Sequence, residues 1–80
     1  MSHYKTPATT AGKIFNKYSR PTIGYGVTVW KFKSLKELDT AYREAVEAIG
    51  ESFISLAKIR LHRSEPDPFG KKVNYIQIFD

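Results

Sequence analysis

The sequence predicts a small α+β domain in which one helix packs on one face of a three- to four-stranded sheet. Three observations favour this class: one stretch with helical periodicity, three stretches with strand composition, and a length of 80 residues. A chain of this size buries only about 60–65% of the surface that its unfolded form exposes, so its core is thin. We therefore expect residues 1–80 to form a single domain with the element order (β)-β-α-β-β.

The helix is predicted over residues 34–50, where apolar residues recur at the spacing of one helical face. Ser34 suits the N-cap because its hydroxyl can accept from an amide of the first turn, and Glu37 completes a capping box. Gly50 stands where a left-handed residue commonly ends a helix. The apolar stripe is too short for a coiled coil or a membrane span, so it needs a sheet to cover.

The segment before the first strong strand has little pattern. Residues 1–12 are polar and threonine-rich without periodicity, which predicts a loosely ordered arm. Residues 13–18 are compatible with a short strand or with a single turn. Pro21 then interrupts the chain before the sheet begins.

Residues 23–33 have the strongest strand composition, because β-branched and aromatic residues dominate them. Gly24 and Gly26 near the start predict a bulge or the close approach of another backbone. Side-chain alternation places Trp30 and Phe32 beneath the helix and turns the lysine after each of them to the opposite face.

Two more strands are predicted after the helix, at residues 53–63 and 72–79. The intervening residues 64–71 hold two prolines and a glycine, which predicts a loop whose Phe69 folds back on the core. A strand, a helix and a strand in one sheet imply a right-handed crossover and a parallel pair. The last strand should pair antiparallel with residues 53–63 because their connection is short.

The charges are unevenly distributed along the chain, whose formal net charge is +5. Residues 34–51 hold two basic and five acidic residues, a net charge of −3, whereas the rest holds eleven basic and three acidic residues, a net charge of +8. A helix on one face of the sheet would then give an acidic side and a basic side. A basic side suits a phosphate backbone or an acidic protein surface. The alternative is that the lysines only keep a small protein soluble.

The predicted binding site is the sheet face opposite the helix, where cations alternate with aromatic residues. Such a face can hold a phosphate backbone while its rings stack on bases. The same composition describes a protein–protein hot spot, and Tyr75 is equally compatible with edge packing or a dimer contact. The candidate residues are Lys31, Lys33, Lys58, Arg60, Arg63, Lys71, Lys72 and Tyr75.

No catalytic or metal-binding motif stands out in the sequence. There is no cysteine, and of the two histidines His62 is predicted to be an outward strand residue and not a general base. The segment 24–26 lacks the third glycine of a phosphate loop, and the chain shows neither a signal peptide nor a long apolar run. We therefore expect a cytoplasmic, non-enzymatic protein with no cofactor, no metal and no membrane partner.

The capped helix at residues 34–50, between the strands 23–33 and 53–63, resembles small phage-encoded inhibitors, among them anti-CRISPR proteins and polymerase inhibitors. The resemblance covers about half of the chain and lies in size and element order, so it carries over no functional residue. It implies a stoichiometric binder that blocks a nucleic-acid-handling complex in the host cytoplasm. Many such inhibitors are acidic DNA mimics, whereas this chain is basic.

Three functions follow from these patterns. The favoured one is a phage-type inhibitor that docks its basic sheet face on nucleic acid or on an acidic surface of a host nucleoprotein complex. The second is a small nucleic-acid-binding accessory protein that acts alone. The third is a self-associating module that forms a homodimer through residues 72–79 at the sheet edge.

Overall fold

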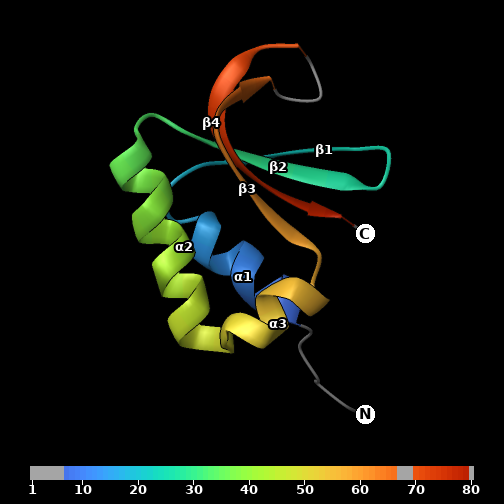
Figure 1. Ribbon diagram of the computed structural model, residues 1–80. Helices are drawn as coiled ribbons and strands as arrows, with labels where there is room; N and C mark the ends of the chain where they lie inside the picture. Colours follow the sequence, from blue (N-terminus) through green and yellow to red (C-terminus); the bar gives the residue numbers. More distant parts are fainter. Residues whose placement is uncertain (1–6, 67–69, 80) are drawn as a thin grey trace.

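The residues that the structure describes, 7–66 and 70–79, form three helices and four strands (Figure 1). This computed structural model confirms the predicted α+β class with a four-stranded sheet. None of the helices within these residues is long and apolar enough to cross a membrane. The elements are α1 (Pro7–Phe15), β1 (Pro21–Gly24), β2 (Val27–Phe32), α2 (Leu35–Ile49), α3 (Glu51–Leu56), β3 (Ile59–Pro66) and β4 (Lys72–Phe79).

The sheet is antiparallel throughout, with the strand order β1-β2-β4-β3. The predicted antiparallel pairing of the last two strands is confirmed. The predicted parallel pair is wrong, because β2 and β3 run in the same direction but β4 lies between them and pairs with both. The predicted position of residues 72–79 at the sheet edge is wrong, since β4 is a central strand that pairs on both sides; a homodimer remains a prediction.

The predicted caps of α2 are present. The Glu37 backbone N–H donates to Ser34 Oγ at 3.2 Å, and Gly50, with φ of 82°, donates its N–H to the Val46 carbonyl at 2.7 Å. The apolar stripe of α2 faces the sheet, as predicted. Its buried residues are Leu38, Ala41 and Ala45.

The strand predicted to begin at residue 53 begins at Ile59 instead, because α3 occupies the first part of that segment. Two backbone bonds support this helix, from Ile54 N–H to the Gly50 carbonyl at 3.2 Å and from Ala57 N–H to the Phe53 carbonyl at 2.9 Å. Ile54 is buried in the core while Phe53 is half exposed. A run of apolar residues this short does not distinguish a helix from a strand by its pattern.

Helix α1 replaces part of the predicted arm. Residues 7–12 form its first turns, whereas residues 1–6 lie outside the described part of the chain. Ala11, Ile14 and Phe15 are buried, and their spacing is that of one helical face. Gly12 faces the Trp30 ring, and a Cβ at this position would lie 3.5 Å from it, which is an ordinary van der Waals contact. Residues 13–18, predicted as a strand or a turn, complete the helix and then form a turn.

The predicted strand 23–33 is two strands joined by a hairpin turn. β1 and β2 are connected by Tyr25 and Gly26, whose φ angles are 39° and 74°. Positive φ at both residues is what a two-residue type I′ hairpin loop requires. The two glycines therefore mark a turn and not the bulge that was predicted.

The predicted loop 64–71 is shorter than expected. β3 continues to Pro66, and Glu65 pairs with Val73 beyond a bulge that begins after His62. Ser64 has a φ of 50°, and its N–H donates to Asn74 Oδ1 at 2.9 Å, which holds the bulge in place. The predicted packing of Phe69 on the core lies outside the described residues.

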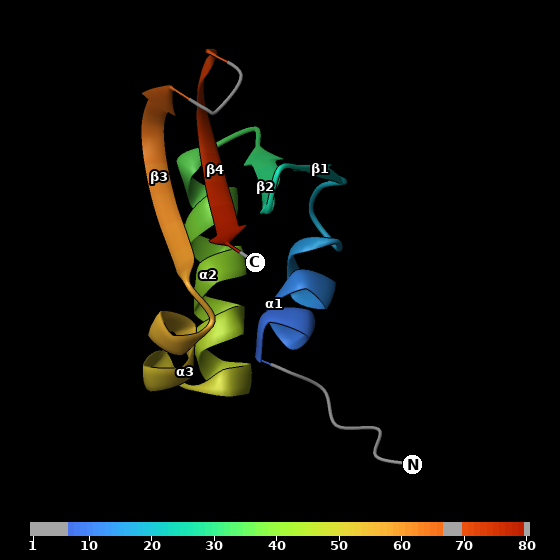
Figure 2. The same cartoon turned by 90° about the vertical axis from the view of Figure 1, so that its right-hand side faces the viewer.

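The helices lie on one face of the sheet; Figure 2 shows α2 behind β3 and β4. Trp30 and Phe32 belong to the core beneath the helices, as predicted, together with Ile76. We call the opposite side the open face. Val29 and Tyr75 on the open face are also buried, although they are not part of the helix-side core.

Candidate functional site

The open face is arranged in rows, because paired residues on neighbouring antiparallel strands share a face. β4 lies in the middle of this face, so side chains on β2 and β3 are separated by two strand spacings, about 10 Å. The rows, read from β2 across β4 to β3, are Lys31, Tyr75 and His62; Val29, Gln77 and Arg60; and Val27 with Phe79.

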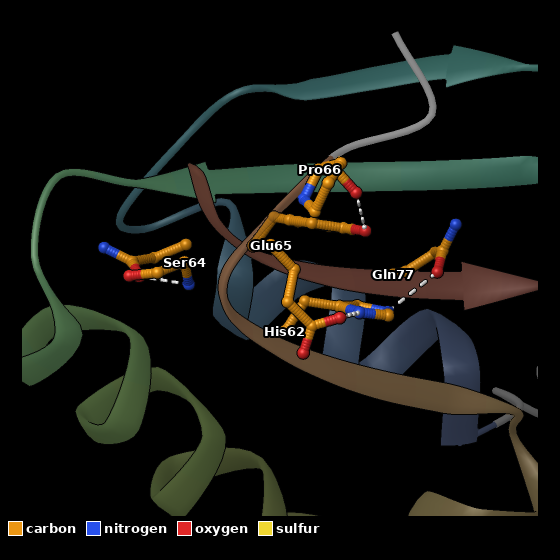
Figure 3. Close-up of polar contacts among 7 residues, drawn as sticks. His62, Ser64, Glu65, Pro66 and Gln77 are labelled. Carbon is orange, nitrogen blue, oxygen red and sulfur yellow. Dashed lines mark hydrogen bonds and ion pairs between the residues drawn. The ribbon is translucent and has the colours of Figure 1, made fainter. Parts of the chain in front are cut away.

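His62 contacts three side chains on the open face. Its ring stacks on Tyr75 with 4.3 Å between centroids and 8° between planes. Figure 3 shows the ring between two acceptors: Nδ1 lies 3.1 Å from Glu65 Oε1, and Nε2 lies 3.0 Å from Gln77 Oε1. A doubly protonated imidazolium donates to both oxygens at once, whereas a neutral ring donates to one. His62 is therefore on the open face, as predicted, but it is fixed in place by its neighbours.

Tyr75 does not act as an exposed aromatic anchor, so this part of the predicted site is wrong. Only 4% of the residue is exposed, and its hydroxyl donates to the Pro66 carbonyl at 2.8 Å. The ring lies on the central strand, and His62 covers one of its faces. A ring that is already stacked and buried cannot take a nucleobase.

Arg60 and Lys31 lie on the open face as predicted, on opposite sides of β4. Arg60 is exposed, and its guanidinium carbon lies 5.4 Å from the centroid of the Phe79 ring. A cation over an aromatic face is attracted by the ring quadrupole, so the position of the guanidinium is favoured without a counter-charge. Arg60 forms no ion pair within the described residues.

Lys33 and Lys58 lie at the ends of strands and not within them. Lys33 directly follows β2, and its side chain is exposed. Lys58 occupies the turn before β3 with a φ of 57°, and its carbonyl accepts the Phe79 N–H at 3.2 Å. The predicted alternation of Lys58 with Arg60 fails because the strand begins only at Ile59.

Arg63, Lys71 and Lys72 do not join the open face. The Arg63 guanidinium donates to Asp39 Oδ1 on α2 at 2.8 Å, so it reaches the helix side. Alternation along β4 places Lys72 with Asn74 on the helix side as well. Lys71 is exposed in the connection just before β4. For Arg63 and Lys72 the prediction is wrong, and their sides follow from alternation along their own strands: Arg63 continues the helix-side series of Ile59 and Leu61 on β3, and Lys72 that of Asn74 on β4.

Two carboxylates of α2 are paired with basic residues, so the helix presents less free negative charge than the sequence suggested. Lys17 binds Glu44 at 3.0 Å, and Arg63 binds Asp39 at 2.8 Å. Exposed pairs of this kind contribute only about 0–1 kcal/mol to folding, but they reduce the field of the carboxylates. Lys17 and Arg63 thus each have a carboxylate partner on α2, whereas Arg60 has none within the described residues.

The helix side offers a different kind of surface. A hollow of about 490 Å³ lies between α1 and α2 and is bounded by the Lys17–Glu44 pair. In the part of the chain that the structure describes, no three histidines, aspartates or glutamates gather as metal ligands would. The predictions of no enzyme and no cofactor remain predictions.

Comparisons of the chain with protein-family models, with curated proteins and with solved structures find no match. The resemblance to phage-encoded inhibitors therefore stays a prediction, and function is argued from the geometry of the open face. One member of this face, Glu65, was not predicted from the sequence. Gln77 lies two residues after Tyr75 on β4, so alternation along the strand predicts that both side chains share a face. Glu65 reaches His62 only because of the bulge in β3, and the bulge has no signature in the sequence.

Proposed function

We propose that this chain is a non-catalytic binding protein whose open face docks on the phosphate backbone of nucleic acid. Arg60 carries the proposal: it is exposed, it lies over Phe79, and it has no carboxylate partner within the described residues. The basic residues Lys17 and Arg63, in contrast, pair with acids of α2. Lys17 and Arg63 would each have to break an ion pair before binding phosphate, whereas Arg60 has no such pair among residues 7–66 and 70–79.

The arrangement of the cations supports one extended backbone along β4. Lys31 and Lys33 stand on the β2 side, and Lys58 and Arg60 stand at the start of β3. Their two strands are about 10 Å apart, and the β4 residues Tyr75 and Gln77 between them are buried. Cations on both sides of β4 suit an anionic chain that lies between them.

The biological role that we propose for this docking is inhibition. A small protein that covers a nucleic-acid backbone, free or within a host nucleoprotein complex, blocks the machinery that needs it. This role follows the similarity in size and element order to phage-encoded inhibitors of the anti-CRISPR type. It places the protein in the host cytoplasm.

The test is a charge reversal on the open face. Arg60→Glu should weaken binding to a fluorescein-labelled single-stranded oligonucleotide by about five- to tenfold, because one phosphate contact is lost and a repulsion is gained. Fluorescence anisotropy at low salt measures the dissociation constant. Lys36→Glu is the matched control, since it makes the same charge change at an exposed position of α2.

Lys36→Glu should bind nearly as well as the wild type, because only long-range attraction changes. Equal losses in the two variants would mean that net charge, and not the open face, determines binding. An unchanged dissociation constant for Arg60→Glu would remove Arg60 from the interface and with it the proposed docking mode.

A further inference from the structure

Tyr25 is an aromatic residue that the fold leaves entirely in solvent. Its side chain is fully exposed, at 109% of the reference area, and within the described residues it makes no hydrogen bond and no ring contact. Figure 1 shows the turn that carries it at the end of the β1–β2 hairpin, far from α2. No protein atom lies within 4 Å of a Cβ built on Gly24 or Gly26, so the surroundings of the turn are open.

The backbone at Tyr25 favours a different residue. Its φ of 39° is in the left-handed region, where the Cβ of an L-residue crowds the following carbonyl oxygen. Asparagine followed by glycine is the preferred sequence for a hairpin loop with positive φ at both positions. Tyrosine at this position therefore costs stability and contributes nothing to the core. Strained residues of this kind are concentrated at functional sites.

The turn adjoins the part of the open face where Arg60 lies. Val27, two residues after Tyr25, pairs with Phe79 across to β4. The Arg60 guanidinium lies over that same Phe79 ring. A strand held by its phosphates near Arg60 therefore has to span about 10 Å across the sheet and about 7 Å along it for its bases to reach the turn.

We infer that Tyr25 is a stacking residue for an unpaired nucleobase, so that the ligand is a single-stranded nucleic acid. The inference rests on the proposed function and specifies its substrate class. Only an unpaired base can turn its face to a ring that projects from a hairpin tip. Every base has such a face, so the contact adds affinity without sequence preference. The net charge of +5 and the exposed Arg60 over Phe79 favour a nucleic acid over an apolar protein pocket.

The decisive variant is Tyr25→Asn, because it improves the turn while it removes the ring. We expect its melting temperature to rise by about 3–6 °C, since asparagine tolerates positive φ. We expect its dissociation constant for a labelled oligothymidylate to rise about five- to a hundredfold. Tyr25→Phe keeps both the ring and the strain, so it should bind like the wild type and melt at the same temperature.

An abasic strand with the same number of phosphates separates stacking from charge. On this probe the wild type and Tyr25→Asn should bind equally, because no base is present to stack. If the wild type binds oligothymidylate but Tyr25→Asn binds it equally well, the inference is wrong and the proposed function stands. If the wild type binds neither probe at low salt, the proposed function itself is wrong.

Discussion

Phe15→Ala is expected to lower the free energy of unfolding by about 3–5 kcal/mol. Phe15 has no exposed surface, and its ring meets Trp30 edge-on with 5.3 Å between centroids. The substitution leaves a cavity between α1 and the sheet, which a close-packed core cannot fill. A domain of this length is stabilised by only about 4–12 kcal/mol in total, so the loss is a large share. Urea denaturation followed by circular dichroism measures it.

Phe53→Ala is the control for this prediction, because it removes the same side chain where half of it is exposed. Its cost should stay below about 1 kcal/mol, since surface substitutions rarely exceed this. Similar losses at the two positions would contradict the docking of α1 on Trp30. A large loss of stability at Phe15 and a small one at Phe53 would support α1 as part of the hydrophobic core.

Leu38→Ala is expected to cost about 2–5 kcal/mol, because Leu38 is fully buried between α2 and the sheet. Leu35→Ala removes the same atoms one turn earlier on the same helix, where 45% of the residue is exposed. We expect the Leu35 variant to lose about 1 kcal/mol or less. The same denaturation experiment compares the two.

A reversal of this order, with Leu35→Ala the more damaging, would contradict the burial of Leu38 against the sheet. The two residues are three apart and share one helical face, so they differ in depth of burial along the helix. The pair therefore tests how α2 packs its apolar stripe.

The features that sequence predicted well are determined by local chemistry. Ser34 and Gly50 bound α2 because their own backbone and side-chain preferences suit those ends. Trp30 and Phe32 face the core because alternation along a strand is a property of the strand itself. The placement of Lys31 and Arg60 on one face follows from the same alternation.

The features that sequence missed depend on contacts between distant segments. Helix α1 is nine residues long and α3 six, and helices this short are marginal in isolation, so packing stabilises them. The insertion of β4 between β2 and β3 is likewise a property of the whole sheet. The local patterns are compatible with β2 and β3 as parallel neighbours, and only the strand order of the whole sheet shows that β4 separates them.

The parts of the candidate site that the sequence missed also depend on contacts between distant segments. Arg63 was expected beside Arg60, but its guanidinium reaches Asp39 on α2, which lies 24 residues away in sequence. Glu65 joins His62 through a bulge held by the Asn74 side chain from the neighbouring strand. Neither contact has a signature within its own segment, because each needs two elements already in place.

The salt dependence of single-strand binding tests the central claim most directly. If Lys31, Lys33, Lys58 and Arg60 each neutralise one phosphate, the logarithm of the binding constant falls with the logarithm of salt concentration with a slope of about −3. Between about 50 and 200 mM salt the dissociation constant should then rise about fiftyfold, and Arg60→Glu should make the slope shallower by about 1. No binding at low salt, or a slope near zero, would contradict the proposal that the open face holds a phosphate backbone.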